Sequence, residues 1–247
     1  MIYPSNWGGG MMRLGPLVLG VLAAVAVPVS ALAGEQGFFA GVDATGGMAF
    51  GSSGTTDGGA PSGGGGTVSN VKFGGMGGIG GHVGYQFDPA LSASISYQHI
   101  RGSIGWDTNF AAGGATRFDG TAISNVVLAN VAYEVPVSER TMLRTTVGAG
   151  LTFNTLSRVV ETLPPGGQLN SILADHTEIG AAAQVGLGLR HTIAPNVVAG
   201  LDGLVAYASG FETGSTRNSN TGVSYINPYK IDNVWRAMIS ASIKVNF

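Results

Sequence analysis

Apolar and polar residues alternate over the last seventeen positions of the chain, residues 231–247. The apolar set consists of Trp235, Ala237, Ile239, Ala241, Ile243, Val245 and Phe247. The intervening set is mostly polar and includes Arg236, Ser240, Ser242 and Lys244. Because successive side chains of a strand point to opposite faces, the segment predicts one long strand with an apolar and a polar side. It is longer than a usual globular strand of roughly 17–20 Å, and long enough for the roughly 9–11 residues of a membrane-spanning strand.

The same two-residue period recurs along the chain and predicts eight strands. They are expected at 37–50, 71–87, 91–105, 122–135, 141–154, 175–191, 197–211 and 231–247. In the first of them Phe38, Val42 and their alternate neighbours form one face, and Phe39 and Asp43 lie on the other. In the second, Val71 and Phe73 are expected to share the apolar face with Ile79, Val83, Tyr85 and Phe87.

The connections between these strands alternate in length. Long segments at 51–70, 106–121, 155–174 and 212–230 alternate with short ones at 88–90, 136–140 and 193–196. Membrane barrels with short periplasmic turns and longer extracellular loops have this alternation. The sequence therefore predicts an all-β, eight-stranded antiparallel up-and-down transmembrane β-barrel with four long outward loops, of which the Gly- and Ser-rich 51–70 should be mobile. A lipocalin-like soluble barrel, the alternative, would turn its apolar face inward around a ligand.

Composition favours the membrane barrel. The chain of 247 residues is 44% hydrophobic and only 11% charged, against roughly 25% charged in an average soluble domain. It has no cysteine, which excludes disulfide and thiolate chemistry. The net charge is −2 with acids and bases spread along the chain, so no basic stripe indicates a nucleic-acid partner.

The amino terminus has the order of a secretory signal peptide. Arg13 precedes an apolar run at 14–29, and Ala31-Leu32-Ala33 provides a small-x-small cleavage site. We expect residues 1–33 to be the signal peptide, with translation starting at Met1, Met11 or Met12, and residues 34–247 to be a single outer-membrane β-barrel domain. A membrane anchor is the alternative, but the run is short and Pro28 interrupts it.

The inward faces of the expected strands carry charges of both signs. Four acids, Asp43, Glu134, Glu178 and Asp202, accompany four bases, Arg144, Arg190, Arg236 and Lys244. The interior of an eight-stranded barrel is just wide enough for side chains to fill it, and unpaired charges there are costly. We therefore expect these eight residues to form an interior polar network that plugs the barrel.

Short motifs resemble a known family. The opening strand Gly37-Phe38-Phe39-Ala40-Gly41-Val42, the Gly84-Tyr85-Gln86-Phe87-Asp88 turn entry and the terminal Phe247 are similar to those of opacity-protein and OmpA-like surface barrels. The resemblance implies a location in the bacterial outer membrane, lipid as surroundings, and surface loops that contact host or environmental ligands. It also implies that the β-barrel assembly machinery reads Phe247 as an assembly signal. It does not imply an enzyme.

Candidate catalytic and cofactor motifs are weak. The run 75–80 matches G-x-G-x-x-G, but it continues as a strand and opens no helix, so no dinucleotide site is expected. No two of the four histidines have metal-site spacing. His99 lies near Ser96 and Ser103, which leaves a lipid-modifying barrel enzyme as one alternative. We assign no catalytic residue, cofactor or metal; a structural or contact role is expected first, and a narrow porin-like channel for small solutes is the other alternative.

Deleting Phe247, or replacing it with a charged residue, should block assembly into the outer membrane, because the apolar alternation of the last strand ends there. The measurement is the amount of heat-modifiable protein in the outer-membrane fraction. Equal amounts from the truncated and intact genes would contradict the prediction.

Overall fold

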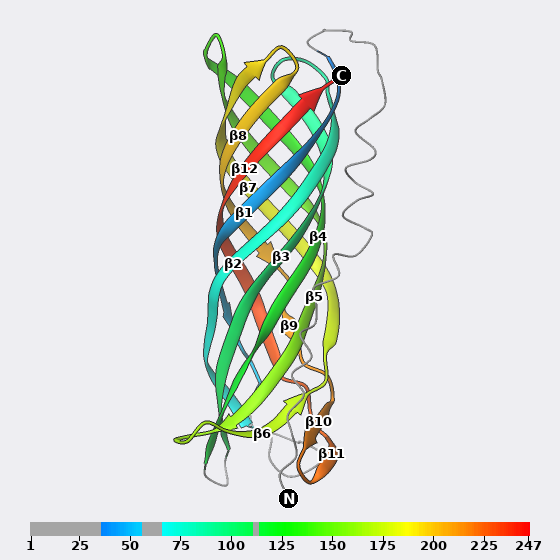
Figure 1. Cartoon of the computed structure of the whole chain (residues 1–247). Helices are drawn as coiled ribbons and strands as arrows, with labels where there is room; N and C mark the ends of the chain where they lie inside the picture. The colour runs from blue at the N-terminus through cyan, green and yellow to red at the C-terminus, as the bar shows by residue number, and fades with distance from the viewer. Residues whose placement is uncertain (1–35, 56–65, 111–113) are drawn as a thin grey trace, which may run out of the picture. The chain divides into compact units, whose positions relative to one another are not determined.

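A computed structural model describes residues 36–55, 66–110 and 114–247. The expected signal peptide and much of the first long loop therefore lie outside the described residues. Eight long antiparallel strands form a closed ring (Figure 1). In ring order they are β1 (Gly37–Ser52), β2 (Gly66–Gln86), β3 (Leu91–Phe110), β4 (Ala115–Ser138), β5 (Thr141–Leu163), β7 (His176–Ala194), β8 (Val197–Ala208) and β12 (Lys230–Asn246). The all-β, eight-stranded barrel predicted from the sequence is confirmed.

Two pairings close the ring. β1 pairs with β12, with Val42 opposite Ile243, and the amide of Phe247 donates to the carbonyl of Phe38 at 2.8 Å. β5 pairs with β7, with Val147 opposite Val185. The chain thus joins its first strand to its last, and both lie side by side in Figure 1.

Short turns connect the strands at one end, which we call the turn end. Asp88 shows why the chain reverses there: its Oδ1 accepts hydrogen bonds from the amides of Ala90 and Leu91 at 2.7 and 2.8 Å. An aspartate that bonds its own backbone in this way is a common basis of tight turns. The opposite end carries the longer connections, and we call it the loop end.

Strands extend into all four segments that the sequence reading assigned to loops. β2 begins at Gly66 and pairs with β3 from there, so the mobile loop predicted at 51–70 is wrong for residues 66–69. β3 continues to Phe110, and β4 begins at Ala115. Beyond Leu156, β5 pairs with β6 (Gln168–Leu173). The last connection contains β9 (Phe211–Glu212), β10 (Thr216–Ser219) and β11 (Gly222–Tyr225). β6, β10 and β11 extend the sheet from β5 at the loop end, and β9 pairs with β12.

The prediction that Val71 and Phe73 share the outward apolar face of β2 is wrong. Register shifts between Ser69 and Lys72 and between Phe73 and Met76 mark two bulges in β2. Since a bulge adds a residue to one strand, it changes which face the following side chains occupy. Both residues pack against the interior core, and the ring of Phe73 lies 6.2 Å from that of Phe211.

The outward face of the ring is apolar. Large exposed side chains such as Val42, Ile79, Ile95, Val131 and Ile239 point away from the interior. Near the turn end the ring of Tyr85 lies edge-to-face with those of Phe38 and Phe87, at 5.0 and 5.3 Å, and Tyr207 and Trp235 make a similar contact at 5.3 Å further along the wall. An apolar band flanked by aromatic residues is typical of membrane barrels. Among the residues described, no helix is both long and apolar enough to cross a membrane.

Candidate functional site

The barrel interior at the turn end contains a group of charged side chains that we call the charged layer. Its members are Asp43, His82, Glu134, Arg144, Arg190, Asp202 and Lys244. Strand register explains their proximity: Glu134 lies opposite Arg144, Arg144 opposite Gly188, and Gly188 opposite Asp202. A Cβ at position 188 would lie 2.2 Å from an oxygen of Asp202, so only glycine leaves room for the carboxylate there.

Three contacts pair the charges of this layer. Arg190 donates from an Nη to Oδ2 of Asp202 at 2.7 Å, with both side chains almost fully buried. Arg144 lies 3.8 Å from Oε1 of Glu134, and its Nε donates to the hydroxyl of Thr146 at 3.0 Å.

The third contact joins Nδ1 of His82 to Oδ2 of Asp43 at 3.0 Å. The sequence reading did not include His82 in the interior group, although it lies in phase with the inward face of β2.

Lys244 lies over the ring of Phe39, with its Nζ 4.9 Å from the ring centroid. A buried ammonium over an aromatic face gains a cation–π attraction. Within the described part of the chain Lys244 forms no ion pair with a carboxylate.

Arg236 is buried in the interior but has no acidic partner among the residues described. Its Nη2 donates to the hydroxyl of Ser124 at 2.5 Å, and that hydroxyl donates to Oδ1 of Asn154 at 2.6 Å. Thr152 also donates to Oδ1 of Asn154, at 2.8 Å. The expected pairing of four acids with four bases therefore does not extend to Arg236, which lies among neutral hydrogen-bonding groups.

Glu178 does not join the interior group. Its side chain is 45% exposed and lies 3.6 Å from Nε2 of His176. The cause is the length of β8, which ends at Ala208 opposite Ala182, so that residues of β7 before Ala182 have no β8 partner beside them. Glu178 has the phase of an inward residue, but here the wall is open.

Aromatic side chains fill the interior at the loop end, and we call Trp106, Phe118 and Tyr229 the aromatic layer. The rings of Trp106 and Phe118 are stacked at 5.2 Å with 8° between their planes. Tyr229 packs 4.9 Å from Phe118 and 6.1 Å from Trp106. All three are buried within a larger apolar cluster. The sequence reading missed this layer by ending the strands at Gly105 and beginning again at Ala122, although Ile100, Ile104 and Trp106 keep the two-residue period.

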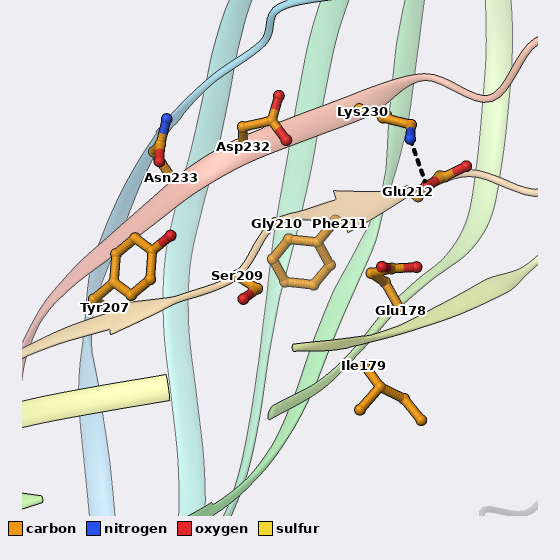
Figure 2. A pocket seen from close by; sticks show the side chains of 10 residues that line it. All are labelled: Glu178, Ile179, Tyr207, Ser209, Gly210, Phe211, Glu212, Lys230, Asp232 and Asn233. Atoms are coloured by element: carbon orange, nitrogen blue, oxygen red, sulfur yellow. Dashed lines mark ion pairs between the residues drawn. The ribbon is translucent and has the colours of Figure 1, made fainter. Parts of the chain in front are cut away.

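A cleft of about 300 Å³ lies where β8 ends. Figure 2 shows its lining: Glu178 and Ile179 come from β7, Tyr207 from β8, Ser209 to Glu212 from the following segment, and Lys230, Asp232 and Asn233 from β12. Nζ of Lys230 lies 3.4 Å from Oε2 of Glu212. The cleft is thus a polar opening in an otherwise apolar wall.

A family model described as "Outer membrane protein beta-barrel domain" matches residues 19–226. The chain belongs to this family. It is therefore a barrel of the bacterial outer membrane, and its outward apolar face lies in membrane lipid.

Solved structures of other barrels resemble this outer-membrane barrel. Neisserial surface protein A is 14% identical, with 85% of this chain and 97% of that chain covered and a TM-score of 0.42. OprG from Pseudomonas aeruginosa is 13% identical, with 88% and 100% covered and a TM-score of 0.46. The outer membrane protease OmpT from Escherichia coli is 9% identical, with 86% and 94% covered and a TM-score of 0.48. No curated protein sequence matches the chain significantly. Membership of the family therefore rests on the family model.

Arg190→Met and Arg236→Met should differ in their effect on the free energy of unfolding. Arg190→Met leaves Asp202 buried without its cation and should cost about 3–5 kcal/mol. Arg236→Met removes the buried cation together with its hydrogen bond to Ser124 and leaves no acid unpaired. Its cost should therefore stay below about 3 kcal/mol. Urea titrations of the barrel in lipid vesicles measure both, with the outward Ile239→Val, at about 1 kcal/mol, as control. Equal costs for the two arginines would contradict the assigned pairing.

Proposed function

We propose that this outer-membrane barrel is a non-enzymatic surface protein with a structural or host- and environment-contact role, whose interior is plugged and whose four long connections face the cell exterior. The observation that carries the proposal is the filling of the interior by two separate layers. The charged layer occupies the turn end and the aromatic layer the loop end. Since an eight-stranded barrel has an interior just wide enough for side chains, two filled layers leave no space for a wide aqueous path.

The charged layer supports this role further through the energetics of its ion pairs. Arg190 and Asp202 form a close, charge-assisted hydrogen bond at 2.7 Å. Opening a path through the interior requires such pairs to separate, which leaves buried charges uncompensated. A narrow channel for small solutes, the alternative, would need this layer to rearrange during conduction.

The loop end is the working part in this proposal. Ring strands of 16–24 residues in β1 to β5 exceed the roughly 9–11 residues that span a membrane, so they continue beyond the bilayer. The β6–β10–β11 extension presents exposed apolar side chains, Leu169, Ile172, Val223 and Tyr225, at this end. Exposed apolar groups away from the membrane-facing band are typical of contact surfaces.

The histidine and serine side chains that could suggest a lipid-modifying enzyme form hydrogen bonds with other groups. Nδ1 of His99 lies 2.8 Å from Oδ1 of Asn125, whereas the hydroxyl of Ser96 accepts a hydrogen bond from Asn130 at the buried face. Ser209 in the cleft accepts from the amide of Ala181 at 2.8 Å and donates to its carbonyl at 3.1 Å. Ser96 lies opposite His82 in the register of β2 and β3, but within the described ranges neither serine forms a hydrogen bond with a histidine. A lipid-modifying activity would be detected as a changed lipid composition of outer membranes that contain the protein.

Export and assembly complete the proposal. Residues 1–33 act as a cleaved signal peptide, and the β-barrel assembly machinery recognises the final strand through Phe247. Support for the second step comes from the apolar face of β12, whose Trp235, Ile239 and Ile243 are exposed on the outward side.

Purified protein in a planar bilayer should show little or no conductance, because both interior layers close the path. The measurement is single-channel current under symmetric salt, with a protein-free bilayer as control. A large, steady and weakly selective conductance would reject the plugged interior.

A peptide epitope inserted between Asn220 and Thr221 should bind antibody on intact cells, because these residues form the turn between β10 and β11 at the loop end. The matched control is the same epitope between Glu139 and Arg140, in the turn between β4 and β5. It should bind antibody only after the outer membrane is permeabilised. The reverse pattern would overturn the orientation.

A further inference from the structure

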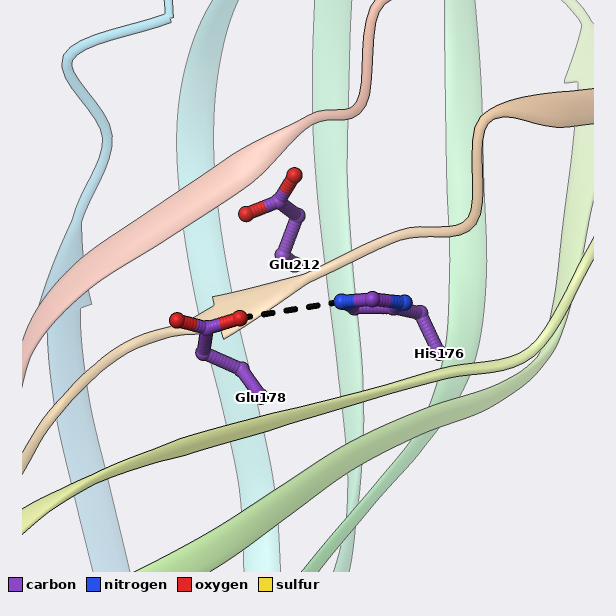
Figure 3. Close-up of side chains that lie close together, drawn as sticks. All are labelled: His176, Glu178 and Glu212. Atoms are coloured by element: carbon purple, nitrogen blue, oxygen red, sulfur yellow. Dashed lines mark ion pairs between the residues drawn. The ribbon is translucent and has the colours of Figure 1, made fainter.

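Three side chains beside the cleft bring metal-ligating atoms together, and we call His176, Glu178 and Glu212 the His–Glu cluster. One ligand atom of each lies within 4.8 Å of those of the other two. Figure 3 shows His176 and Glu178 extending from the same strand toward the segment that carries Glu212. The fold thus brings Glu212 close to two residues that precede it by more than thirty positions in the sequence.

The backbone explains how the three side chains meet. His176 and Glu178 are two residues apart in β7, so they project from the same face of the strand. Glu212 is brought near them by β9, which pairs with β12. Gly210 permits this pairing: a Cβ at this position would lie 2.1 Å from the carbonyl oxygen of Ile231.

We propose that the His–Glu cluster binds a single divalent transition-metal ion of the Zn²⁺ class. Imidazole nitrogen is a preferred ligand of Zn²⁺, and carboxylate oxygens complete such sites. Zinc binds nitrogen and oxygen at about 2.0–2.2 Å, so its ligand atoms lie roughly 3.3 Å from one another in a tetrahedral site. Nε2 of His176 and Oε2 of Glu178 are already 3.6 Å apart.

Only small side-chain movements separate the present arrangement from a metal site. The side chains of His176 and Glu178 are 41% and 45% exposed, so each can change rotamer without disturbing the core. Glu212 has to exchange its contact with Lys230, whose Nζ lies 3.4 Å from Oε2. Lys230 is therefore the competitor of the metal ion for this carboxylate.

The electrostatics of the cleft favour a cation. Glu178, Glu212 and Asp232 line it, and Lys230 is the single basic residue of its lining. Three acids against one base give the lining excess negative charge, which attracts a cation. Three protein ligands leave one position of a tetrahedral ion open toward the cleft, as in zinc sites that exchange a water.

The test is a titration of Zn²⁺ into the full mature barrel, free of any histidine tag and folded in detergent micelles, followed by calorimetry. Co²⁺ is a second probe, because its visible absorption reports coordination by nitrogen and oxygen. We expect one ion per chain and retention of Zn²⁺ in an excess of Mg²⁺ and Ca²⁺. No binding, or equal binding of Ca²⁺, would overturn the proposal.

Variants of the cluster assign the ligands. His176→Ala and Glu212→Gln should each weaken binding by at least the roughly 10- to 100-fold that loss of an outer-shell partner costs. The control His191→Ala, at an exposed histidine near the turn end, should leave it unchanged. Heat-modifiability on gels shows whether each variant is folded. Unchanged affinity in folded His176→Ala and Glu212→Gln would refute the ligand set.

Lys230→Met provides a test in the opposite direction. Methionine keeps an apolar stem but removes the ammonium that holds Glu212, so Zn²⁺ should bind more tightly than to the wild type. A role of these residues in folding alone would not tighten metal binding. Weaker or unchanged binding to Lys230→Met would contradict the competition between Lys230 and the metal ion.

Discussion

The structure depends on the requirement that every backbone amide and carbonyl in the lipid has a hydrogen-bond partner. Lipid offers none, so a sheet can cross the bilayer only when it closes on itself and has no edge. The pairing of β1 with β12 meets that requirement along the register from Phe39 to Ser52. Once the ring is closed, the pleat determines the rest: alternate side chains face lipid, and the others share a narrow interior.

That narrow interior explains why its polar groups are so specifically placed. Arg190 and Asp202 lie in a space bounded by Gly200 and Gly188, where any side chain would collide with them. Arg236 shows a different solution, in which a buried guanidinium donates to Ser124 within a set of neutral groups. Lys244 shows a third, an aromatic face. With Glu178 outside, the interior group has four bases but only three acids, and the cations that lack an acid are stabilised by neutral hydrogen-bonding groups or by an aromatic ring.

The sequence contained enough information to predict the eight strands and the outward face, because the period of two is strong in segments such as β12 and β3. It did not reveal the bulges of β2, because a bulge changes the face of Phe73 without leaving a break in the apolar pattern. It also missed the aromatic layer, since the Gly and polar residues around Trp106 and Phe118 read as a loop. Glu178 was assigned to the interior from its phase, and only the early end of β8 exposes it. The His–Glu cluster had one visible signal, the alternation of His176 and Glu178 on one strand face, but the approach of Glu212 depends on tertiary structure.

The seam between β1 and β12 also bears on the order in which the barrel forms. Most neighbouring ring strands follow one another in the chain and pair as local hairpins, whereas Val42 and Ile243 are about 200 residues apart, which makes their loop-closure entropy the largest in the ring. Pairing of such distant segments is intrinsically slow. We therefore expect the seam to be the last pairing to form, and until then β1 and β12 have open edges that can pair with other chains.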